Sequence, residues 1–199
     1  MSLKAQADGT LSADSRKFEG LYIGINSGTQ SIFSTATINE LSVPGQSSRW
    51  TAEFLIAHRW QFLNNRIVFG LEVQVGLTDG NLDRTFNGLR QLEIHFSNNS
   101  QTGLGYTLGY VAGEKQNLLL YTYLYQTRRN FDISLKDDGR VIQWQRDIQT
   151  VLRFGLGLEY NLGKRFSTRL TVGSQSPDLN NDIDIEEVPE LTLGFIYQF

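Results

Sequence analysis

Residues 117–162 read NLLLYTYLYQTRRNFDISLKDDGRVIQWQRDIQTVLRFGLGLEYNL and predict one very long β-hairpin. Its tip is Asp138-Gly139, the dipeptide that a two-residue type I′ turn prefers. Each arm has about 20 residues, far more than the ~5–6 of an ordinary globular strand. A strand of this length, with one face apolar over roughly ten outward positions, indicates a β-barrel that crosses a membrane and projects above it.

The register of this hairpin follows if Asp137 pairs with Arg140 and the pairing continues without a slip. An apolar and aromatic outer face then contains the facing pairs Tyr125–Leu152, Tyr123–Phe154 and Tyr121–Leu156. The opposite face contains the pairs Leu124–Arg153 and Leu118–Glu159, and across the preceding turn the pairs Gly109–Leu120 and Gly105–Leu124. Glycine opposite leucine is the small–large alternation that a narrow barrel interior requires.

Composition limits the other possibilities. The 199 residues suit one domain, and 3 prolines, 19 glycines and 12% aromatic residues favour an all-β protein. The absence of cysteine excludes disulfides, thiolate metal sites and a cysteine nucleophile. A net charge of −3 speaks against nucleic acid as a partner. The sequence has no run of 18 apolar residues, so no membrane-spanning helix is expected. A barrel strand is apolar only at alternate positions and needs no such run.

The N-terminal residues do not read as a signal peptide, because Met1–Ala5 carries a charge but no apolar segment follows it. For an exported barrel this suggests a mature or recombinant form. We expect residues 1–18 to be a flexible tail and residues 19–199 to form the transmembrane β-barrel.

Alternation along the chain predicts an eight-stranded antiparallel up-and-down barrel. The expected strands are 20–26, 50–62, 67–78, 92–110, the two hairpin arms, 166–174 and 191–199. Long surface loops are expected at 27–49, 79–88 and 175–190, and short turns at 63–66, 113–116 and 163–165. Short turns that alternate with long loops are typical of the two sides of an outer membrane.

Two features of this strand assignment need a choice. A ten-stranded barrel results if the chain turns at Asn98-Asn99 and again near Arg128–Asn130; eight is preferred because the even-numbered apolar phase continues through the first site and the hairpin register through the second. A soluble barrel would bury the apolar and aromatic face around a ligand and expose the opposite face to water. That opposite face consists of small residues with few charges, which is unfavourable for a soluble surface. Aromatic residues near the short turns predict an interfacial girdle of Trp60, Phe62, Tyr160, Phe166, Tyr197 and Phe199.

Several motifs carry a resemblance to a known family, namely Gly20-Leu21-Tyr22-Ile23-Gly24, Phe69-Gly70-Leu71-Glu72, residues 154–160 (FGLGLEY) and residues 194–199 (GFIYQF). Residues 19–199 resemble the small outer-membrane barrels of the OmpA/OmpX type, and in particular the porin-like surface antigens of Gram-negative bacteria. The resemblance implies a bacterial outer-membrane protein that contacts a host or phage surface ligand through its extracellular loops. The alternating last strand that ends in Phe199 is similar to the signal read by the barrel-assembly machinery.

The inward face is predicted to hold a network of ion pairs, formed by Glu53, Arg59, Glu72, Arg153, Glu159 and Arg169. An unpaired buried charge is costly, so a mutually satisfied network that closes the narrow lumen is the favoured interpretation. The alternative is a selectivity constriction in a small pore.

Arg129 and Arg146 are predicted to face outward just above the bilayer, because about 9–11 residues of a strand cross it. Guanidinium groups suit phosphate, so one hypothesis is that this pair binds lipopolysaccharide. The other interpretation is that a strand simply becomes polar where it leaves the membrane, with Arg146 stacking on Phe131.

Catalysis finds little support in the sequence. A lipid A-modifying enzyme is the alternative function, yet His58 is expected on the lipid face without a serine and acid beside it, and His95 has no metal-ligand spacing. Asp182, Asp184 and Glu186 alternate as calcium ligands could, although an EF-hand glycine is missing and a solvated acidic loop is the favoured interpretation. No cofactor or metal is therefore expected.

Overall fold

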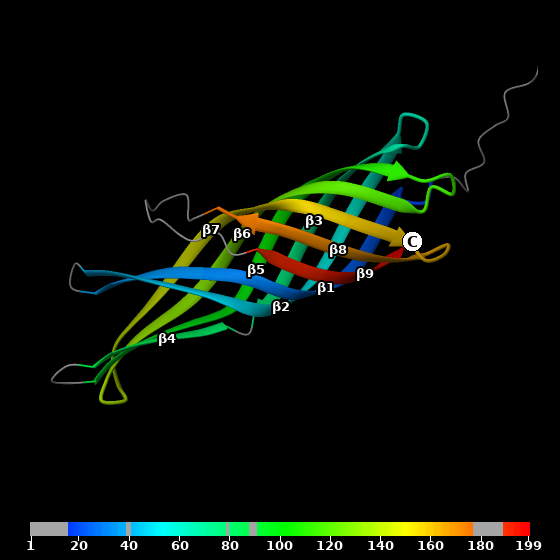
Figure 1. The fold of residues 1–199 in the computed structure, drawn as a ribbon. Helices are drawn as coiled ribbons and strands as arrows, with labels where there is room; N and C mark the ends of the chain where they lie inside the picture. Colours follow the sequence, from blue (N-terminus) through cyan, green and yellow to red (C-terminus); the bar gives the residue numbers. More distant parts are fainter. Residues whose placement is uncertain (1–15, 39–40, 79, 88–90, 177–188) are drawn as a thin grey trace, which may run out of the picture.

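The computed structural model describes residues 16–38, 41–78, 80–87, 91–176 and 189–199. The regular elements in these residues are antiparallel strands, which form an elongated barrel with long projections at one end (Figure 1). Their bounds are β1 Gly20–Ile38, β2 Leu41–Phe62, β3 Ile67–Thr78, β4 Gly80–Asn87, β5 Gln91–Ala112, β6 Leu118–Asp137, β7 Arg140–Asn161, β8 Phe166–Gln175 and β9 Glu190–Gln198.

The barrel is a closed ring of eight strands. The hydrogen-bonded order is β3-β2-β1-β9-β8-β7-β6-β5, and β3 pairs with β5 to close it. The ninth strand, β4, pairs with Gln91–Asn98 of β5, beyond the part of β5 that pairs with β3. The eight-stranded prediction is therefore confirmed. Neither turn that a ten-stranded barrel would need occurs, because β5 and β6 are each continuous.

Two predicted loops are largely strands. β1 and β2 stay paired through residues 27–38 and 41–49, from the pair Ser27–Ala52 to the pair Ile38–Leu41, and β4 occupies most of residues 79–88. Outside a bilayer a strand needs no apolar face toward lipid, so segments rich in serine, threonine and asparagine can still pair. Most of the predicted loop 175–190 lies outside the described residues.

The predicted hairpin register is wrong below the tip. Asp137 does pair with Arg140, and Asp138 and Gly139 have φ values of 48° and 78°, as a type I′ turn requires. A β-bulge between Leu135 and Lys136 then leaves Ile142 as an extra residue on β7. One extra residue moves every later pair by one position.

As a result, three tyrosines of β6 point into the lumen rather than toward lipid. Tyr121, Tyr123 and Tyr125 are buried, while Leu120 and Leu124 are exposed on the outer surface. Their facing residues across the wall are Gly157, Gly155 and Arg153 on β7, and Gly109, Thr107 and Gly105 on β5. A Cβ atom at Gly157 would lie 2.1 Å from Cζ of Tyr121, so glycine makes room for a tyrosine ring where we expected leucine.

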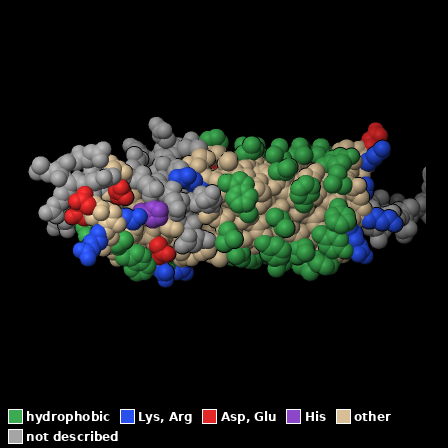
Figure 2. All heavy atoms as spheres, turned by 90° about the horizontal axis from the view of Figure 1, so that it is seen from below, with side chains coloured by type: hydrophobic (Ala, Val, Ile, Leu, Met, Phe, Trp, Pro, Cys, Tyr) green, Lys and Arg blue, Asp and Glu red, His purple; other side chains and the backbone are tan. Residues whose placement is uncertain are grey.

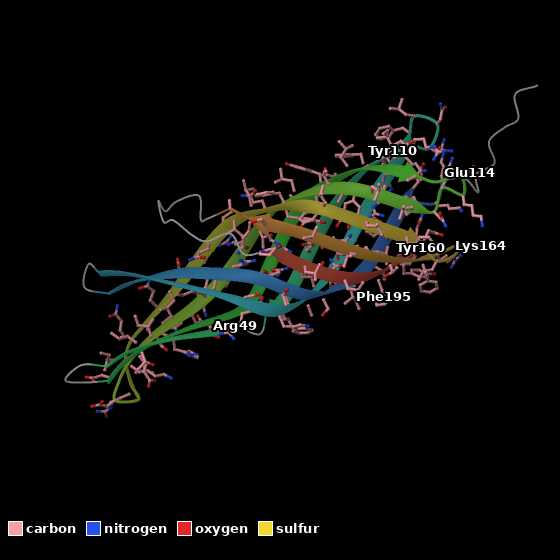
Figure 3. The ribbon with its side chains drawn as sticks, in the orientation of Figure 1. Arg49, Tyr110, Glu114, Tyr160, Lys164 and Phe195 are labelled. Carbon is pink, nitrogen blue, oxygen red and sulfur yellow. The ribbon has the colours of Figure 1, made fainter. Side chains whose placement is uncertain are left out.

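A belt of apolar side chains surrounds the barrel between its two ends (Figure 2). At the end with the short turns, Phe166 and Tyr197 have ring centroids 5.2 Å apart, and Tyr197 and Phe199 5.1 Å apart, within the predicted girdle. In Figure 3, Tyr110, Tyr160 and Phe195 point away from the wall. Glu114 and Lys164 lie in the turns beyond them, and Arg49 lies toward the opposite end, so charged residues bound the belt on both sides (Figure 3).

Beyond the belt, β4, β5, β6 and β7 continue as a sheet that we call the arm, formed by residues 80–87, 91–98, 130–137 and 140–150 (Figure 1). A second β-bulge, between Asn98 and Ser100, marks its start on β5. The even-numbered phase does not survive this bulge: Leu104 below it is 59% exposed, whereas Ile94 above it is 2% exposed. The strand continues as predicted, but its inner and outer faces exchange.

The N-terminal boundary of the folded region falls earlier than predicted. Residues 1–15 of the expected tail lie outside the described residues. Phe18, however, is only 1% exposed, and it packs with Val68, Val111 and Leu119 at the end of the lumen that carries the short turns. Its backbone N–H donates to Oε1 of Gln61. The chain is therefore held in the barrel mouth before β1 begins.

Candidate functional site

The lumen contains two layers of paired charges. The lower layer, nearer the short turns, is centred on Glu72 of β3. Arg169 Nη1 lies 3.2 Å from Glu72 Oε2, and Arg59 Nη2 lies 3.5 Å from Glu72 Oε1. Arg59 also binds Glu159 at 2.8 Å. The hydroxyls of Tyr22 and Tyr125 both donate to the Glu72 carboxylate.

The upper layer is centred on Arg153 of β7. Its Nη1 lies 2.7 Å from Oε1 of Glu53, and its Nε lies 2.9 Å from Oε2 of Glu190. Glu53 also accepts hydrogen bonds from Gln30 and Gln101, at 2.9 and 2.8 Å. Arg153 Nη1 also donates to Oε1 of Gln74 at 3.4 Å.

The charges of the lumen balance. Among the described residues the buried acidic side chains are Glu53, Glu72, Glu159 and Glu190, and the buried basic side chains are Arg59, Arg129, Arg153 and Arg169. Four negative and four positive groups leave no net charge. Each is at most 3% exposed, so both layers lie inside the barrel wall. Phe18 lies beneath them, in the mouth of the lumen.

All six residues predicted for the lumen network are in it and paired with one another or with Glu190. Glu159 and Arg169 face each other in the register of β7 and β8, and each forms its ion pair with another residue of the network. Sequence reasoning missed Glu190, placed in a loop, and Tyr22 and Tyr125. Correct placement of the bulge would have put Tyr125 on the inner face.

Arg129 was predicted on the wrong face. It is fully buried in the upper layer, where its Nε donates to Gln101 at 3.1 Å and its Nη2 to Gln30 at 3.1 Å. It also lies 3.9 Å from Glu190. Because odd-numbered residues of β6 face inward, Arg129 cannot form an outward pair with Arg146, and the predicted two-arginine lipopolysaccharide site does not exist in this structure.

Arg146 does face outward, on the outer face of the arm. Its Nε lies 3.1 Å from Oδ1 of Asp132, the residue opposite it on β6. Its guanidinium carbon lies 5.5 Å from the centre of the Trp144 ring, not over Phe131, which is buried on the inner face. Trp144 is 59% exposed, and Ile142 and Ile148 are exposed on either side of it. The outer face of β7 thus carries an apolar strip interrupted by one cation.

Arg128 is the arginine that faces outward near the top of the apolar belt. It lines a shallow depression of about 540 Å³ on the outer wall, together with Thr102, Gln126 and Thr150 from neighbouring strands. The guanidinium is exposed. The depression joins the apolar belt below, through Val73 and Leu104, to polar residues above.

The remaining candidates from the sequence have simple placements. His58 lies on the lipid-facing surface with its ring 4.6 Å from that of Trp60. His95 is half-buried on β5 in the arm. Asp182, Asp184 and Glu186 lie outside the described residues. Within the described ranges, no group of three or more histidine or carboxylate residues is placed to hold a metal ion, and no helix is long and apolar enough to cross a membrane.

Comparison with solved structures supports the fold. The chain is similar to Ail, the attachment invasion locus protein of Yersinia pestis, with 17% identity and a TM-score of 0.52 over 91% of this chain and 99% of that one. It is similar to Neisserial surface protein A with 11% identity and a TM-score of 0.50 over 91% and 98%. A comparison with curated proteins finds no match.

The family follows from the sequence as a whole. The model of the outer membrane protein beta-barrel domain matches residues 2–199, almost the full length of the chain. This agrees with the ring of eight strands, the apolar belt and the paired polar lumen. The resemblance to small barrels of the OmpA/OmpX type is confirmed: the chain belongs to the outer membrane protein β-barrel family and resides in the bacterial outer membrane.

Proposed function

We propose that the barrel is a closed support whose arm binds ligands outside the cell. The observation that carries this proposal is the strip of Ile142, Trp144 and Ile148, which remains exposed above the belt. Counting about 9–11 residues upward from Tyr160 places the outer edge of the bilayer near Thr150. Trp144 lies roughly six residues further up the strand. Exposed apolar residues that do not touch lipid mark interaction surfaces.

The filled lumen argues against transport as the main role. Ion pairs link strands across the lumen in both layers, and separating one of them would leave a buried charge without compensation. A small pore would conduct ions across a bilayer, whereas a closed barrel would not. In planar bilayers we expect the protein to show no steady conductance, and large stable channels would contradict the closed barrel.

A binding experiment tests the arm directly. Cells that display the protein would be presented to a panel of immobilised glycans and serum proteins, with cells that lack it as the blank. We expect retention on at least one surface, and its loss in the variant Ile142→Ser/Trp144→Ser/Ile148→Ser. The matched control Gln143→Ser/Gln149→Ser changes the other face of the same strand. Equal retention by the apolar-strip variant would refute the proposed surface. Ail, which shares the fold, is named for attachment.

A contact with the outer leaflet is a second proposal, favoured by the depression at Arg128. An exposed guanidinium at the top of an apolar belt is placed to bind a lipid phosphate, and lipopolysaccharide supplies phosphates at this level. Lipopolysaccharide that binds the folded state raises stability by mass action. We expect Arg128→Gln to lose most of that gain and Arg146→Gln, paired with Asp132, to keep it. An equal gain in Arg128→Gln would reject the contact.

The last strand supports a further partner. Leu191, Leu193 and Phe195 alternate outward on β9, and Phe199 directly after it is also exposed. This pattern suits recognition by the barrel-assembly machinery, and we expect Phe199→Ser to lower the amount of protein assembled in the outer membrane while the purified chain still refolds in detergent. Normal assembly of Phe199→Ser in cells would argue against this partner.

A further inference from the structure

One edge of the arm has no neighbour among the described strands. β7 pairs with β6 along its whole length, but its pairing with β8 begins only at Arg153. The last contacts on that side join Leu152 to Ser176: the Leu152 N–H donates to Ser176 Oγ at 3.1 Å, and the Leu152 carbonyl accepts from the Ser176 N–H at 2.7 Å. Above this point only β6 lies beside β7 in the part of the chain that the structure describes.

The direction of the backbone groups on this edge follows from Leu152. Both of its backbone groups point toward β8, and the pairing of β7 with β6 is regular from Tyr160 to Gln143. Because a strand repeats every two residues, the N–H and C=O groups of Thr150, Ile148, Arg146 and Trp144 point to the same side. These groups can therefore accept another strand, and two of the same residues, Trp144 and Ile148, belong to the apolar strip.

Residues 142–148, Ile-Gln-Trp-Gln-Arg-Asp-Ile, are complementary to their own reverse. In an antiparallel pair centred on Gln145, Trp144 of one copy lies opposite Arg146 of the other, and Ile142 lies opposite Ile148. These are a cation–π pair and an apolar pair. A centre at Arg146 would instead place two arginines directly opposite each other, which is unfavourable. Charge and shape thus favour one register.

We propose that the β7 edges of two copies of this chain, anchored in facing membranes, pair antiparallel about Gln145. In every copy within one membrane, β7 runs from the tip of the arm down to the bilayer, so an antiparallel partner must run upward and belong to a membrane that faces the first. This inference rests on the proposed role of the arm and names its partner as a second copy of the chain.

Asp147 controls this edge. Its Oδ1 accepts the backbone N–H of Ile148 at 2.9 Å, and its Oδ2 lies 3.3 Å from Nε2 of Gln149. The carboxylate thus occupies one of the donors that a partner strand needs. Pairing must displace it, so the side chain limits association, as edge-blocking residues do in other sheets.

Disulfide formation between two copies tests the register. The chain has no cysteine of its own. In the proposed register Gln145 is the residue that faces itself, in a non-hydrogen-bonded pair with a Cα separation of about 4.5 Å, which suits a disulfide. Under mild oxidation we expect Gln145→Cys to give a covalent dimer. In the control Gln143→Cys, residue 143 of one copy faces residue 147 of the other, so the two cysteines are four residues apart. This variant is expected to stay monomeric.

Two preparations of phosphatidylcholine vesicles, one with tagged and one with untagged Gln145→Cys protein, distinguish facing membranes from one membrane. We expect dimers with one tagged and one untagged chain only after mixing. Adding Arg146→Pro, which removes an edge N–H without touching the β6 side, should abolish them, whereas Arg146→Val should retain them in part. Adding Asp147→Ala should increase them. Circular dichroism would verify that each variant is folded.

Two results would overturn the inference: no dimer from Gln145→Cys, or dimers formed only within one vesicle population after mixing. Either result leaves the proposed function standing if the apolar-strip variant still loses retention on the ligand panel. The edge would then be open to an extended segment of a different protein. If retention and dimer formation both fail, the arm is not a binding surface.

Discussion

The barrel and the arm are built from the same strands but have opposite interiors. In the barrel, the inner face holds Glu72 and Arg169, and the outer face is apolar. In the arm, the inner face of β6 holds Phe131 and Ile133, both buried, only two and four residues beyond the buried Arg129. The surroundings of the outer face explain the change. Lipid requires apolar side chains outside, whereas water allows them to turn inward.

The largest difference should appear when a charge is removed from the lumen. Glu72→Gln keeps the shape but leaves Arg169 without its ion-pair partner, so we expect a loss of about 3–5 kcal/mol in the free energy of unfolding. Urea unfolding in lipid vesicles measures it. The same change at Glu114, exposed in a turn, should have little effect. Equal stability of the two variants would contradict a lumen held together by its charges.

Closure by Phe18 should matter almost as much. Phe18→Ala removes a buried ring from the barrel mouth, with an expected loss of about 3 kcal/mol. Phe18→Leu refills most of the volume and should cost less than about 1.5 kcal/mol. Both values come from the same unfolding measurement. If alanine and leucine behave alike, the side chain does not pack in the mouth as described.

At the tip of the arm the effect should be smaller. Gly139 has φ +78°, and nothing lies within 4 Å of a Cβ added there, so only backbone strain opposes a side chain. We expect Gly139→Val to cost about 1–2 kcal/mol and Gly139→Asn, which tolerates this conformation, to cost less. Failure of Gly139→Val to refold in detergent would mean that the tip directs folding of the whole barrel.

The smallest effect is expected for the exposed ion pair of the arm. Arg146 and Asp132 are 61% and 31% exposed, and solvent screens them. We expect Asp132→Ala to change the free energy of unfolding by about 0–1 kcal/mol. The loss of unfolding free energy should thus be much smaller for this ion pair in the arm than for Glu72→Gln in the barrel. A loss as large as that of Glu72→Gln would show that the arm, too, depends on its charges.

Alternation in the sequence was enough to predict the barrel, the girdle and the six lumen charges, because lipid on one side enforces a strict period of two. It failed where that constraint is absent. The segment 27–49 was interpreted as a loop because it lacks the alternating apolar residues by which a membrane-spanning strand is recognised. The bulge at Leu135 and Lys136 depends on local backbone conformation, which no residue pattern there reveals.

The bulge explains the functional errors as well. One extra residue at Ile142 turned the predicted lipid-facing tyrosines into lumen residues and moved Arg129 from the surface to the upper layer. The polar groups favour the observed placement: the Tyr125 hydroxyl and the Arg129 guanidinium have hydrogen-bond partners in the lumen and would have none in hydrocarbon. Weighing each face by the polar groups it must satisfy would have identified the correct one.

The lower layer also has a consequence for the order of folding. Glu72 receives Tyr22 from β1, Arg59 from β2, Tyr125 from β6 and Arg169 from β8, residues separated from it by up to 97 positions in the chain. These contacts can form together only when β1 meets β9 and the ring closes. Until then each charge must remain hydrated. The last step of assembly should therefore expel water and lock the pairs at once, which makes closure cooperative and a partly closed barrel short-lived.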